Sequence, residues 1–565
     1  MTNYRNINGA TSDLIDAFTE TVSRYSARPA IECHGNSLSY RQLGAMAGLL
    51  AEHLGVGPGV VAVPAIHAPE TVVGLLGVLA AGGVYCPVDP AFPPQRRVAM
   101  LAAVGCRTGL ATTAATVTTA VTATAAPDGQ PGAAGWGLEG LGLDLVGVPR
   151  SAVPEPADPA ADPAAEPRPD GPGGGEPYRV EPEQPAYLLF TSGSTGQPKP
   201  VVTPRRAISA AVASLRELFG LTPDDRVLQF ASLNWDTCFE EILPTLTAGA
   251  TLVLDAEAHS GSFPRFLRMV ERERITVLNL PTAFWNELVL HLTEERQALP
   301  ASVRLLVIGG EAARPARLAD WAALDSGRIR LLNTYGSTET TLITHAVDLH
   351  GPLAAERVRP WATGDRVPIG RALPHVLERI GEQDELMVGG PAVALGYHGL
   401  PEATAARFAV ADGVRWFRTG DRVSRAPDGV LTHLGRLDGE LKVRGIRVDP
   451  AEVEAEIAGH PGVGAVAVTG VTEAGRSALV AYVVPRLAGS ADGLDAEVRA
   501  YLRGRVPGHL VPGRITVVAE LVHTASGKVD RAGSHRRHSA RGPGTGQTSG
   551  AAPVRSDLQG LSDKP

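Results

Sequence analysis

Short, continuous apolar runs alternate with helical stretches between Ala186 and Leu332, and this alternation restricts the fold more than any other feature of the sequence. The runs cover 227–230, 250–254, 275–280, 304–308 and 329–332. Apolar residues at helical spacing separate them, as in 238–246 and 264–273, and Pro264 stands where a first helical turn tolerates proline. Strands buried on both faces, with helices between them, predict a parallel or mixed α/β sheet.

The 565 residues are too many for one compact core, so we expect at least two domains. A helix at 40–54 and a buried strand at 60–64 begin the first domain. After residue 437 the pattern changes to a smaller α+β unit with a strand at 440–443 and helices at 451–458 and 495–502. We therefore expect a large N-terminal domain over 1–437 and a small C-terminal domain over 438–533, joined by a hinge.

Two segments have compositions that favour disorder. The stretch from about 124 to 182 is rich in Ala, Pro and Gly, and it cannot bury enough apolar surface to offset its ordering entropy. We predict a mobile insert there, with one surviving strand near 143–146. The Gly, Ser, Arg and Pro content of 534–565 predicts a disordered tail.

Composition excludes several functional classes. The formal net charge of −8 gives no reason to expect nucleic-acid binding, which needs a basic face. The four cysteines form no CxxC pair, which argues against a disulfide framework or a structural zinc site. The N-terminus lacks the pattern of a secretory signal, and the apolar stretch 71–84 is shorter than the ~20 residues of a membrane helix. We expect a cytoplasmic protein without membrane contact.

The string TSGSTGQPK at 191–199 follows an apolar run that predicts a strand. Its glycines allow close backbone approach to an anion, its hydroxyls are donors, and its lysine supplies a charge for a polyphosphate. Pro198 prevents a helix from starting there, so the string is not a Walker P-loop. The alternative is a flexible Ser/Gly loop. The candidate phosphate-binding residues are Thr191, Ser192, Gly193, Ser194, Thr195, Gly196 and Lys199.

This string resembles the phosphate-binding loop of the adenylate-forming superfamily, which includes acyl-CoA synthetases, luciferases and the adenylation domains of nonribosomal peptide synthetases. The resemblance extends from about Leu38 to Arg531, except for the Ala/Pro-rich insert. Further similar segments, in the family's order and at its spacing, are VLAAGGVY at 78–85, NTYGSTET at 333–340, WFRTGD at 416–421, GRLDGELKVRG at 435–445 and SGKVDR at 526–531.

The resemblance implies an ATP- and Mg²⁺-dependent ligase in which a carboxylate oxygen attacks the α-phosphate and pyrophosphate leaves. Both reactants are anionic, so the enzyme must neutralise charge and align them. Lys528 would be the cation that reaches both, Glu339 would hold Mg²⁺, and Thr338 would contact the α-phosphate. The expected nucleotide contacts are Asp421 to the ribose hydroxyls with Arg436 supporting, Tyr335 stacked on adenine beside Gly336, and Asn333 at the adenine amino group.

Each of these residues also has an ordinary structural explanation. Asp421 follows Gly420 and could be a turn residue, and Glu339 could complement a helix dipole. Lys528 follows Gly527 and could decorate a solvated hairpin. The contexts quoted above favour the chemical roles over these explanations.

Asp438 lies between the two expected domains, at the family's hinge position. The resemblance implies that the small domain rotates between two arrangements. The first brings Lys528 to the adenylate site, and the second withdraws it and admits a thiol past Lys442 and Gly445. Gating by a few residues at element ends is physically reasonable.

Asp236 indicates the class of acid. It lies in NWDTCFEE at 234–241, which resembles the acyl-pocket lining of the family, and amino-acid-activating members have an aspartate here that pairs with the substrate ammonium. A buried carboxylate facing a pocket is costly without a cationic partner. The alternative is that Asp236 only caps the helix that starts near Thr237.

The resemblance also gives the remaining pocket positions: Thr237, Glu240, Asn279, Val307, Gly309, Thr334, Leu342 and Ile343. Gly309 and Thr334 are small and leave depth, while Glu240 adds a second acid. This set is similar to the pockets for lysine-type diamino acids, with β-lysine the nearest match. Alternatively, Glu240 faces solvent and Glu241 fills the family's usual glutamate position.

We therefore predict a stand-alone adenylation enzyme that transfers an aminoacyl group to the phosphopantetheine thiol of a separate carrier protein. The residues after Arg531 contain no attachment motif of the GGxS type. Two alternatives remain: an acyl- or aryl-CoA ligase of the same superfamily, against which Asp236 argues, and a non-catalytic scaffold, against which Lys528, Glu339 and Asp421 argue.

Overall fold

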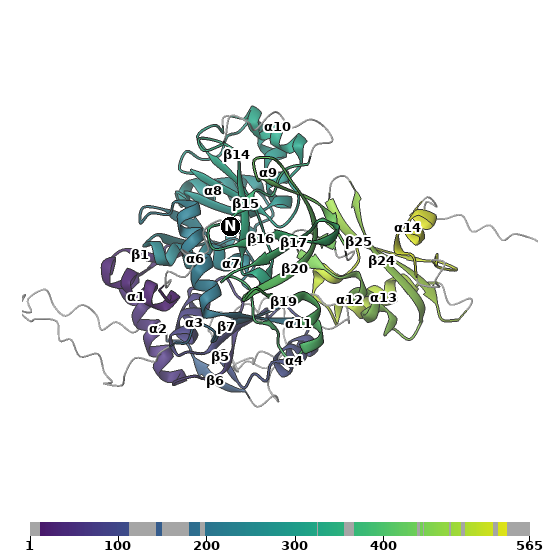
Figure 1. Cartoon of the computed structure of the whole chain (residues 1–565), viewed down its shortest axis with the longest axis horizontal. Coiled ribbons are helices and arrows are strands. Elements are labelled where there is room, and N and C mark those ends of the chain that lie inside the picture. Colours follow the sequence, from purple (N-terminus) through teal and green to yellow (C-terminus); the bar gives the residue numbers. More distant parts are fainter. Residues whose placement is uncertain are drawn as a thin grey trace, which may run out of the picture.

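A large N-terminal domain and a smaller C-terminal domain make up the chain in the computed structural model (Figure 1). The structure describes residues 12–111, 143–149, 180–191, 198–324, 326–354, 366–437, 441–443, 446–473, 476–487, 492–523 and 529–539. The large domain contains three sheets and most of the helices, and the small domain continues from β22 (Leu441–Val443) to the last described helix.

The largest sheet of the described chain has nine strands, in the order β15-β14-β13-β12-β11-β9-β10-β1-β2. Its central strands are short and almost entirely apolar, and they pair in parallel, as expected for strands covered on both faces. The strands are β1 (Pro29–Cys33), β2 (Asn36–Ser39), β9 (Arg226–Leu228), β10 (Thr251–Leu254), β11 (Val277–Pro281), β12 (Leu305–Gly309), β13 (Arg330–Gly336), β14 (Ile343–His350) and β15 (Arg371–Ala372).

A second, seven-stranded sheet has the order β18-β8-β7-β4-β3-β5-β6. Its antiparallel pair β7–β8 flanks the TSGSTGQPK string, so this string joins two strands rather than a strand and a helix. The strands are β3 (Val60–Pro64), β4 (Val84–Val88), β5 (Thr108–Ala111), β6 (Asp144–Gly147), β7 (Pro185–Thr191), β8 (Lys199–Pro204) and β18 (Gly396–Tyr397).

Helices pack between and around these two sheets. α3 is apolar on nearly every side and is buried along its length. α2 begins with a capping box, in which Ser39 and Gln42 form reciprocal hydrogen bonds between side chain and backbone. The helices of the large domain are α1 (Leu14–Arg24), α2 (Tyr40–Leu54), α3 (Pro69–Ala80), α4 (Pro94–Ala103), α6 (Arg205–Phe219), α7 (Thr237–Ala248), α8 (Phe263–Arg272), α9 (Thr282–Glu295), α10 (Pro315–Ala323) and α11 (Pro401–Arg407), with short 3₁₀ turns η1 (Ala256–His259), η2 (Thr338–Thr340) and η3 (Glu382–Asp384).

A third sheet completes the large domain on the side of the small one, where β17 and β20 lie nearest to it in Figure 1. It has the order β16-β17-β20-β19, and β21 pairs with β20. Asp421 lies opposite Arg436 in the β20–β21 pairing. The strands are β16 (Leu377–Ile380), β17 (Glu385–Gly389), β19 (Phe408–Ala411), β20 (Val414–Arg425) and β21 (Leu431–Arg436).

The small domain has its own apolar core, built from α12, α13 and a three-stranded sheet. Its elements are the hairpin β22 (Leu441–Val443) and β23 (Ile446–Val448), α12 (Pro450–Ala458), β24 (Val463–Glu473), β25 (Arg476–Pro485), α13 (Leu494–Arg503), η4 (Gly508–Leu510), β26 (Arg514–Val517) and α14 (Arg531–Ser539). α14 lies at the end of the molecule away from the large domain (Figure 1).

The expected fold class and the main elements are confirmed, and most observed bounds agree with the sequence prediction within a few residues. One expectation is wrong: the segment from Ser534 is not disordered throughout, because α14 continues to Ser539. Ser534 is fully buried and its Oγ accepts from the Val522 amide at 2.9 Å. Most of the predicted mobile insert, and residues 540–565, lie outside the described residues.

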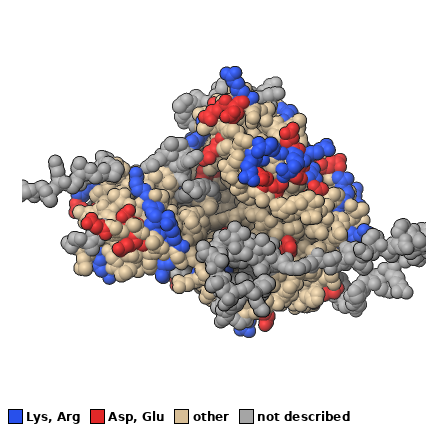
Figure 2. Space-filling view, turned by 180° about the vertical axis from the view of Figure 1, so that it is seen from behind, with Lys and Arg blue, Asp and Glu red and all other residues tan. Residues whose placement is uncertain are grey.

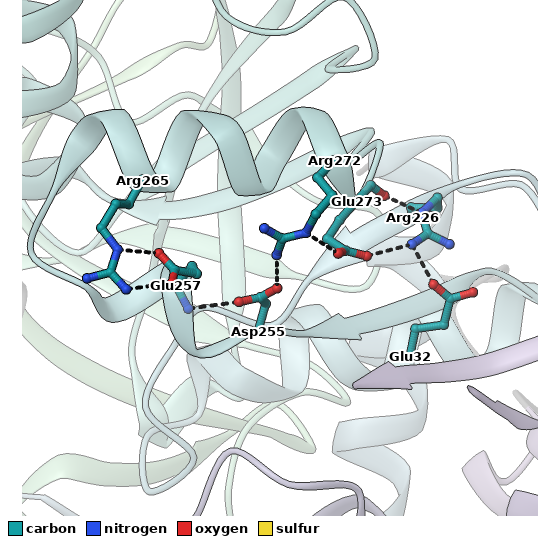
Figure 3. Close-up of polar contacts among 7 residues, drawn as sticks. All are labelled: Glu32, Arg226, Asp255, Glu257, Arg265, Arg272 and Glu273. Atoms are coloured by element: carbon teal, nitrogen blue, oxygen red, sulfur yellow. Dashed lines mark hydrogen bonds and ion pairs between the residues drawn. The ribbon is translucent and has the colours of Figure 1, made fainter. Parts of the chain in front are cut away.

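Charges of both signs are mixed on the surface seen from behind, where Lys and Arg side chains lie beside Asp and Glu on both domains (Figure 2). Figure 3 shows such a group, a row of ion pairs that links α8, η1, β9 and β1. Arg265 and Glu257 pair at 2.6 Å there, and Arg226 contacts Glu32 at 2.6 Å. In the described part of the chain, no helix is both long enough and apolar enough to span a membrane.

Candidate active site

A cavity of about 310 Å³ lies where the carboxyl ends of β11, β12 and β13 meet the start of α7 and the β20–β21 pair. Ligands bind at the carboxyl ends of the strands in open α/β sheets, so this is the expected place for a site. The lining residues are Thr191, Ala231, Ser232, Trp235, Asp236, Thr237, Glu240, Asn279, Leu280, Pro281, Gly309, Gly310, Thr334, Gly336, Ser337, Thr338, Leu342, Ile343, Thr419, Asp421, Arg436 and Ile446.

The buried carboxylate of Asp421 marks one end of this cavity, which we call the nucleotide end after the role that the sequence predicts for Asp421. The Tyr335 hydroxyl donates to its Oδ2 at 2.6 Å. On the other oxygen, Arg436 Nη1 lies at 3.2 Å and His433 Nε2 at 2.9 Å. Burial, and then the charge of Asp421, raise the pKa of Tyr335, so that phenol remains a donor. Asp421 is thus a fixed acceptor surrounded by donors, rather than a turn residue.

Two residues of β13, three positions apart, are constrained in different ways. Asn333 is buried and its side-chain amide donates to the Pro368 carbonyl at 2.7 Å, so it does not line the cavity. Gly336 does line it, and a Cβ at that position would come within 2.0 Å of the Leu342 carbonyl oxygen. Only glycine therefore allows β13 and β14 to close together at the cavity wall.

Glu339 is buried in η2, directly after the cavity-lining Thr338. The Tyr397 hydroxyl donates to its Oε1 at 2.9 Å, and Lys199 Nζ lies 5.6 Å from the centre of the Tyr397 ring. The residues described contain no group of three or more His, Cys, Asp or Glu arranged for a metal. Mg²⁺ commonly binds through one or two carboxylates and takes phosphate oxygens and waters as its other ligands, and Glu339 could supply one such carboxylate.

Asp236 and Glu240 also line the cavity, and we call their part of it the acyl end after the role that the sequence predicts for them. They lie one turn apart at the start of α7, so their side chains share a helix face. Asn279 Nδ2 donates to Glu240 Oε2 at 2.9 Å. Burial raises the pKa of Asp236 to about 6, against a hydrogen bond from Thr338, and raises that of Glu240 to about 8. Both acids face a space in which a cation would be stabilised.

Two alternatives from the sequence concerned these acids. Asp236 occupies the N-cap position of α7, but its side chain makes no capping hydrogen bond. Glu240 is buried and lines the cavity, so it does not face solvent. Glu241 points elsewhere, because its carboxylate accepts from the backbone amides of Phe230 and Ala231 at 3.1 Å.

The other residues predicted for the acyl pocket are mostly brought together. A Cβ at Gly309 would lie 2.6 Å from Thr334 Oγ1, so a larger residue there would require Thr334 to move. Val307 does not line the cavity: it is fully buried two residues earlier in β12, in the apolar core. The predicted residues that do line it are Asp236, Thr237, Glu240, Asn279, Gly309, Thr334, Leu342 and Ile343.

The backbone beside the acyl end is unusual. Thr341 has φ 56° and Leu342 has φ 68°, so two successive non-glycine residues have left-handed conformations. Such a conformation is a strained exception for a β-branched residue like threonine. It turns the chain sharply between η2, which carries Glu339, and β14, so that Leu342 and Ile343 reach the cavity.

Several predicted residues lie outside the described part of the chain. They are Ser192, Gly193, Ser194, Thr195, Gly196, Asp438, Gly445 and Lys528. Lys442 lies in β22, and Ile446, from the same hairpin, lines the cavity.

Sequence reasoning missed four contributors to this region. His433 bonds to Asp421, Tyr397 bonds to Glu339, and Arg96 and Glu452 form an ion pair between the two domains. The partners are separated by 12 to 356 residues in the chain, so no local pattern relates them.

Comparison with protein families identifies both domains. A family model described as "AMP-binding enzyme" matches residues 18–398, and one described as "AMP-binding enzyme C-terminal domain" matches residues 452–528. The first match alone covers more than half of the chain.

Curated relatives agree with this match. An isonitrile lipopeptide synthase from Streptomyces coeruleorubidus is 39% identical over 532 residues, which are 93% of this chain and 33% of that protein. Novobiocin biosynthesis protein H from Streptomyces niveus is 34% identical over 540 residues, covering 92% of this chain and 82% of that protein. The chain spans less than half the length of several relatives, such as 21% of a dimodular nonribosomal peptide synthase from Bacillus subtilis.

Solved structures share the fold. The amide bond synthetase McbA from Marinactinospora thermotolerans has a TM-score of 0.74 at 26% identity, over 92% of this chain and 98% of that one. An artificially fused adenylation–PCP di-domain from Klebsiella oxytoca has a TM-score of 0.70 at 22% identity, over 89% and 93% of the two chains, which concerns the fold alone. With both family models matched in order along its two domains, the chain belongs to the AMP-binding enzyme family.

Proposed function

We propose that this chain activates the carboxylate of an amino acid with ATP, forming an aminoacyl-adenylate and pyrophosphate. A carboxylate oxygen would attack the α-phosphorus, and the bond from that phosphorus to the pyrophosphate oxygen would break. The observation that carries the proposal is one cavity with a hydroxyl-binding carboxylate, Asp421, at one end and two further acids, Asp236 and Glu240, at the other. Membership of the AMP-binding enzyme family supports it.

The nucleotide end is suited to a ribose. Asp421 is a buried acceptor held by donors from β13 and β21, and two vicinal hydroxyls are the donors that such a carboxylate accepts. Thr338 and Thr191 also line the cavity, and their hydroxyls would hold the α-phosphate. Lys528 would approach both reactants as charge shifts in the transition state.

A magnesium ion would be held by Glu339, whose buried carboxylate is oriented by Tyr397. When bound, the ion would neutralise phosphate charge. Lys199, which contacts the same tyrosine ring, would add a second positive charge beside the phosphates.

The acyl end favours a substrate with two amines. The Asn279 amide nitrogen donates to Glu240, and both residues line the cavity, where the Asn279 carbonyl oxygen and the Glu240 carboxylate are potential acceptors. A site of acceptors is suited to an ammonium group, which has three donors and no acceptor. Asp236, one helical turn away, would take the other ammonium. A lysine-type diamino acid satisfies both, and β-lysine is our first choice.

The acyl group would then pass to the phosphopantetheine thiol of a carrier protein. Ile446, on the hairpin that carries Lys442, lines the cavity, which is the feature expected of the thiol-accepting arrangement. Free coenzyme A would be the acceptor if the chain were an acyl-CoA ligase, and the two acids at the acyl end argue against the acyl groups such enzymes use.

ATP–pyrophosphate exchange across a substrate panel tests the proposal. The panel contains lysine, β-lysine, ornithine and diaminobutyrate, with leucine, glutamine, a benzoate and a fatty acid as comparisons. We expect exchange with at least one diamino acid and none with the fatty acid. Exchange only with apolar amino acids would remove the diamino assignment, and exchange only with the benzoate or fatty acid would remove the amino-acid assignment.

Two variants separate the claims. Glu240→Gln removes a charge at the acyl end and keeps Asp236, so diamino-acid exchange should fall while the nucleotide end is unaffected. Glu294→Gln, an exposed change on α9, is the matched control. Carrier loading is then measured with a phosphopantetheinylated carrier protein and with free coenzyme A as competing acceptors.

A further inference from the structure

A small pocket of about 30 Å³ lies where the small domain meets the large one, next to the active-site cavity. Contacts between described residues that cross this boundary include Arg96 to Glu452 and Trp235 to His509. Trp235 lines this pocket and the active-site cavity alike, so it forms part of the wall between them. No predicted role accounts for either contact.

The ion pair is buried and joins two helix starts. Arg96 Nη2 lies 2.8 Å from Glu452 Oε1, and the side chains are only 12% and 0% exposed. Arg96 is in the first turn of α4, where the helix dipole disfavours a cation. Glu452 is in the first turn of α12, where the dipole favours an anion. Glu452 of the small domain therefore neutralises the charge of Arg96, which the dipole of α4 does not stabilise.

The ring contact lies beside the acyl end. The rings of Trp235 and His509 meet edge to face, with centroids 5.6 Å apart and planes at 70°. Asp236, the next residue after Trp235, is one of the two acids of the acyl end. Burial, and then the charge of Arg96, lower the pKa of His509 to about 4, so its ring is neutral at physiological pH. The small domain thus touches the acyl pocket through an uncharged ring.

We propose that Arg96–Glu452 and Trp235–His509 act together as a latch that holds the small domain against the acyl pocket. In the two-step reaction proposed above, on which this inference rests, Trp235 and His509 are positioning residues for the acyl-transfer step. Both contacts join the two domains, so a large rotation of the small domain would break them together. Ile446 of the small domain lines the active-site cavity in this arrangement, so the latch would favour it over the arrangement proposed to bring Lys528 to the adenylate site.

Charge reversal tests the ion pair. We compare Arg96→Glu, Glu452→Arg, the double reversal and the milder Glu452→Gln, each in the full chain. The matched control is the exposed pair Arg265 and Glu257 of Figure 3, reversed in the same way. Carrier loading from preformed adenylate should fall about tenfold in the single reversals, a usual size for coupling between sites, and recover in the double reversal. Pyrophosphate exchange should stay level or rise.

A structural role would give a different result, because a damaged fold lowers both half-reactions together and the double reversal does not restore them. Equal loss of both half-reactions, or no recovery in the double reversal, would overturn the latch. Unchanged loading in every variant would overturn it as well. His509→Ala tests the ring contact in the same way. Carrier loading should fall while pyrophosphate exchange is retained. The relative exchange rates among the amino acids of the panel should be the same as in the wild type.

Small-angle X-ray scattering makes the test independent of the chemistry. The single reversals should give a broader distance distribution than the wild type and the exposed-pair control, and the double reversal should return to the wild-type curve. If no amino acid is activated, the proposed function fails while this measurement still decides the latch. Identical scattering from all variants would overturn the latch even if the proposed function holds.

Discussion

The two ends of the cavity treat buried carboxylates in opposite ways. At the nucleotide end, Asp421 accepts from Tyr335, His433 and Arg436, and its charge is compensated before any ligand arrives. At the acyl end, burial raises the pKa of Asp236 to about 6 and that of Glu240 to about 8. The first end is complete as it stands, whereas the second lacks positive charge. Buried acids without a cationic partner favour a ligand that carries positive charge.

We expect the largest effect on the contrast between the two ends from a substitution at Asp236. Asp236→Asn keeps the shape of the acyl end and removes the charge that the substrate ammonium would meet. We expect amino-acid-dependent exchange to fall roughly a hundredfold or more, as when one member of a buried charge pair is lost. The midpoint temperature of thermal unfolding of the substrate-free protein at pH 8 should be unchanged or slightly raised, because burial disfavours the ionised aspartate that the wild type carries. Retained exchange would show that Asp236 does not bind the ammonium.

A second, smaller effect is expected at Glu240. Glu240→Gln should raise the KM for lysine-type substrates about tenfold, the size expected for a lost charged hydrogen bond, while the KM for ATP stays level. The KM of the same variant for glutamine or leucine should rise much less. Equal losses for all side chains would mean that Glu240 only supports the packing of α7.

The pH dependence of binding sharpens the same contrast. Below pH 8 the empty pocket carries a proton on Glu240, because burial raises its pKa to about 8, and a diammonium substrate must displace that proton. The KM for a diamino acid should therefore fall as pH rises from 6.5 to 8, by up to about tenfold per unit. The profile of Glu240→Gln should be flatter over this range. A wild-type profile that does not differ from that of Glu240→Gln contradicts the assignment.

The nucleotide end should respond to loss of a donor rather than of charge. His433→Phe removes the Nε2 contact with Asp421, and we expect the KM for ATP to rise about fivefold with little change in kcat, the size of one lost hydrogen bond. His433→Gln can still offer a side-chain amide and should recover most of the affinity. Equal defects in the two variants would indicate a packing role for the ring.

The smallest effect is expected far from both ends, in the surface row of ion pairs in Figure 3. Arg265→Ala breaks an exposed pair with Glu257, and water replaces what is lost. Neither exchange nor the thermal midpoint should change measurably. A clear loss of stability would mean that the row acts as a network.

Much of the sheet architecture could be predicted from the sequence, because apolar runs and turn residues are local signals. β3 and α2 have the predicted bounds, and the eight acyl-pocket residues that line the cavity were identified through motif resemblance. Val307 was misplaced, since the resemblance gives a position but not how deep a side chain lies in the core.

Long-range polar contacts could not be predicted. α14 has little apolar periodicity, and it is held by the Arg531–Glu454 pair at 2.6 Å and by the contact of His535 with the Tyr482 hydroxyl at 2.7 Å. His433 and Arg96 meet their partners only after the chain has folded. Composition alone describes such residues as ordinary surface charge.

The left-handed backbone at Thr341 and Leu342 limits how this pocket can be redesigned. A substitution at Leu342 must suit both the ligand and a φ of 68°, and glycine, asparagine and aspartate adopt that conformation most readily. Valine or isoleucine, common choices for reshaping an apolar wall, would strain the chain between Glu339 and β14. Thr237, Glu240 and Asn279 lie in regular helix and strand, where backbone geometry permits most side chains. A substrate-switching library therefore gains most by varying those three positions and leaving the turn unchanged.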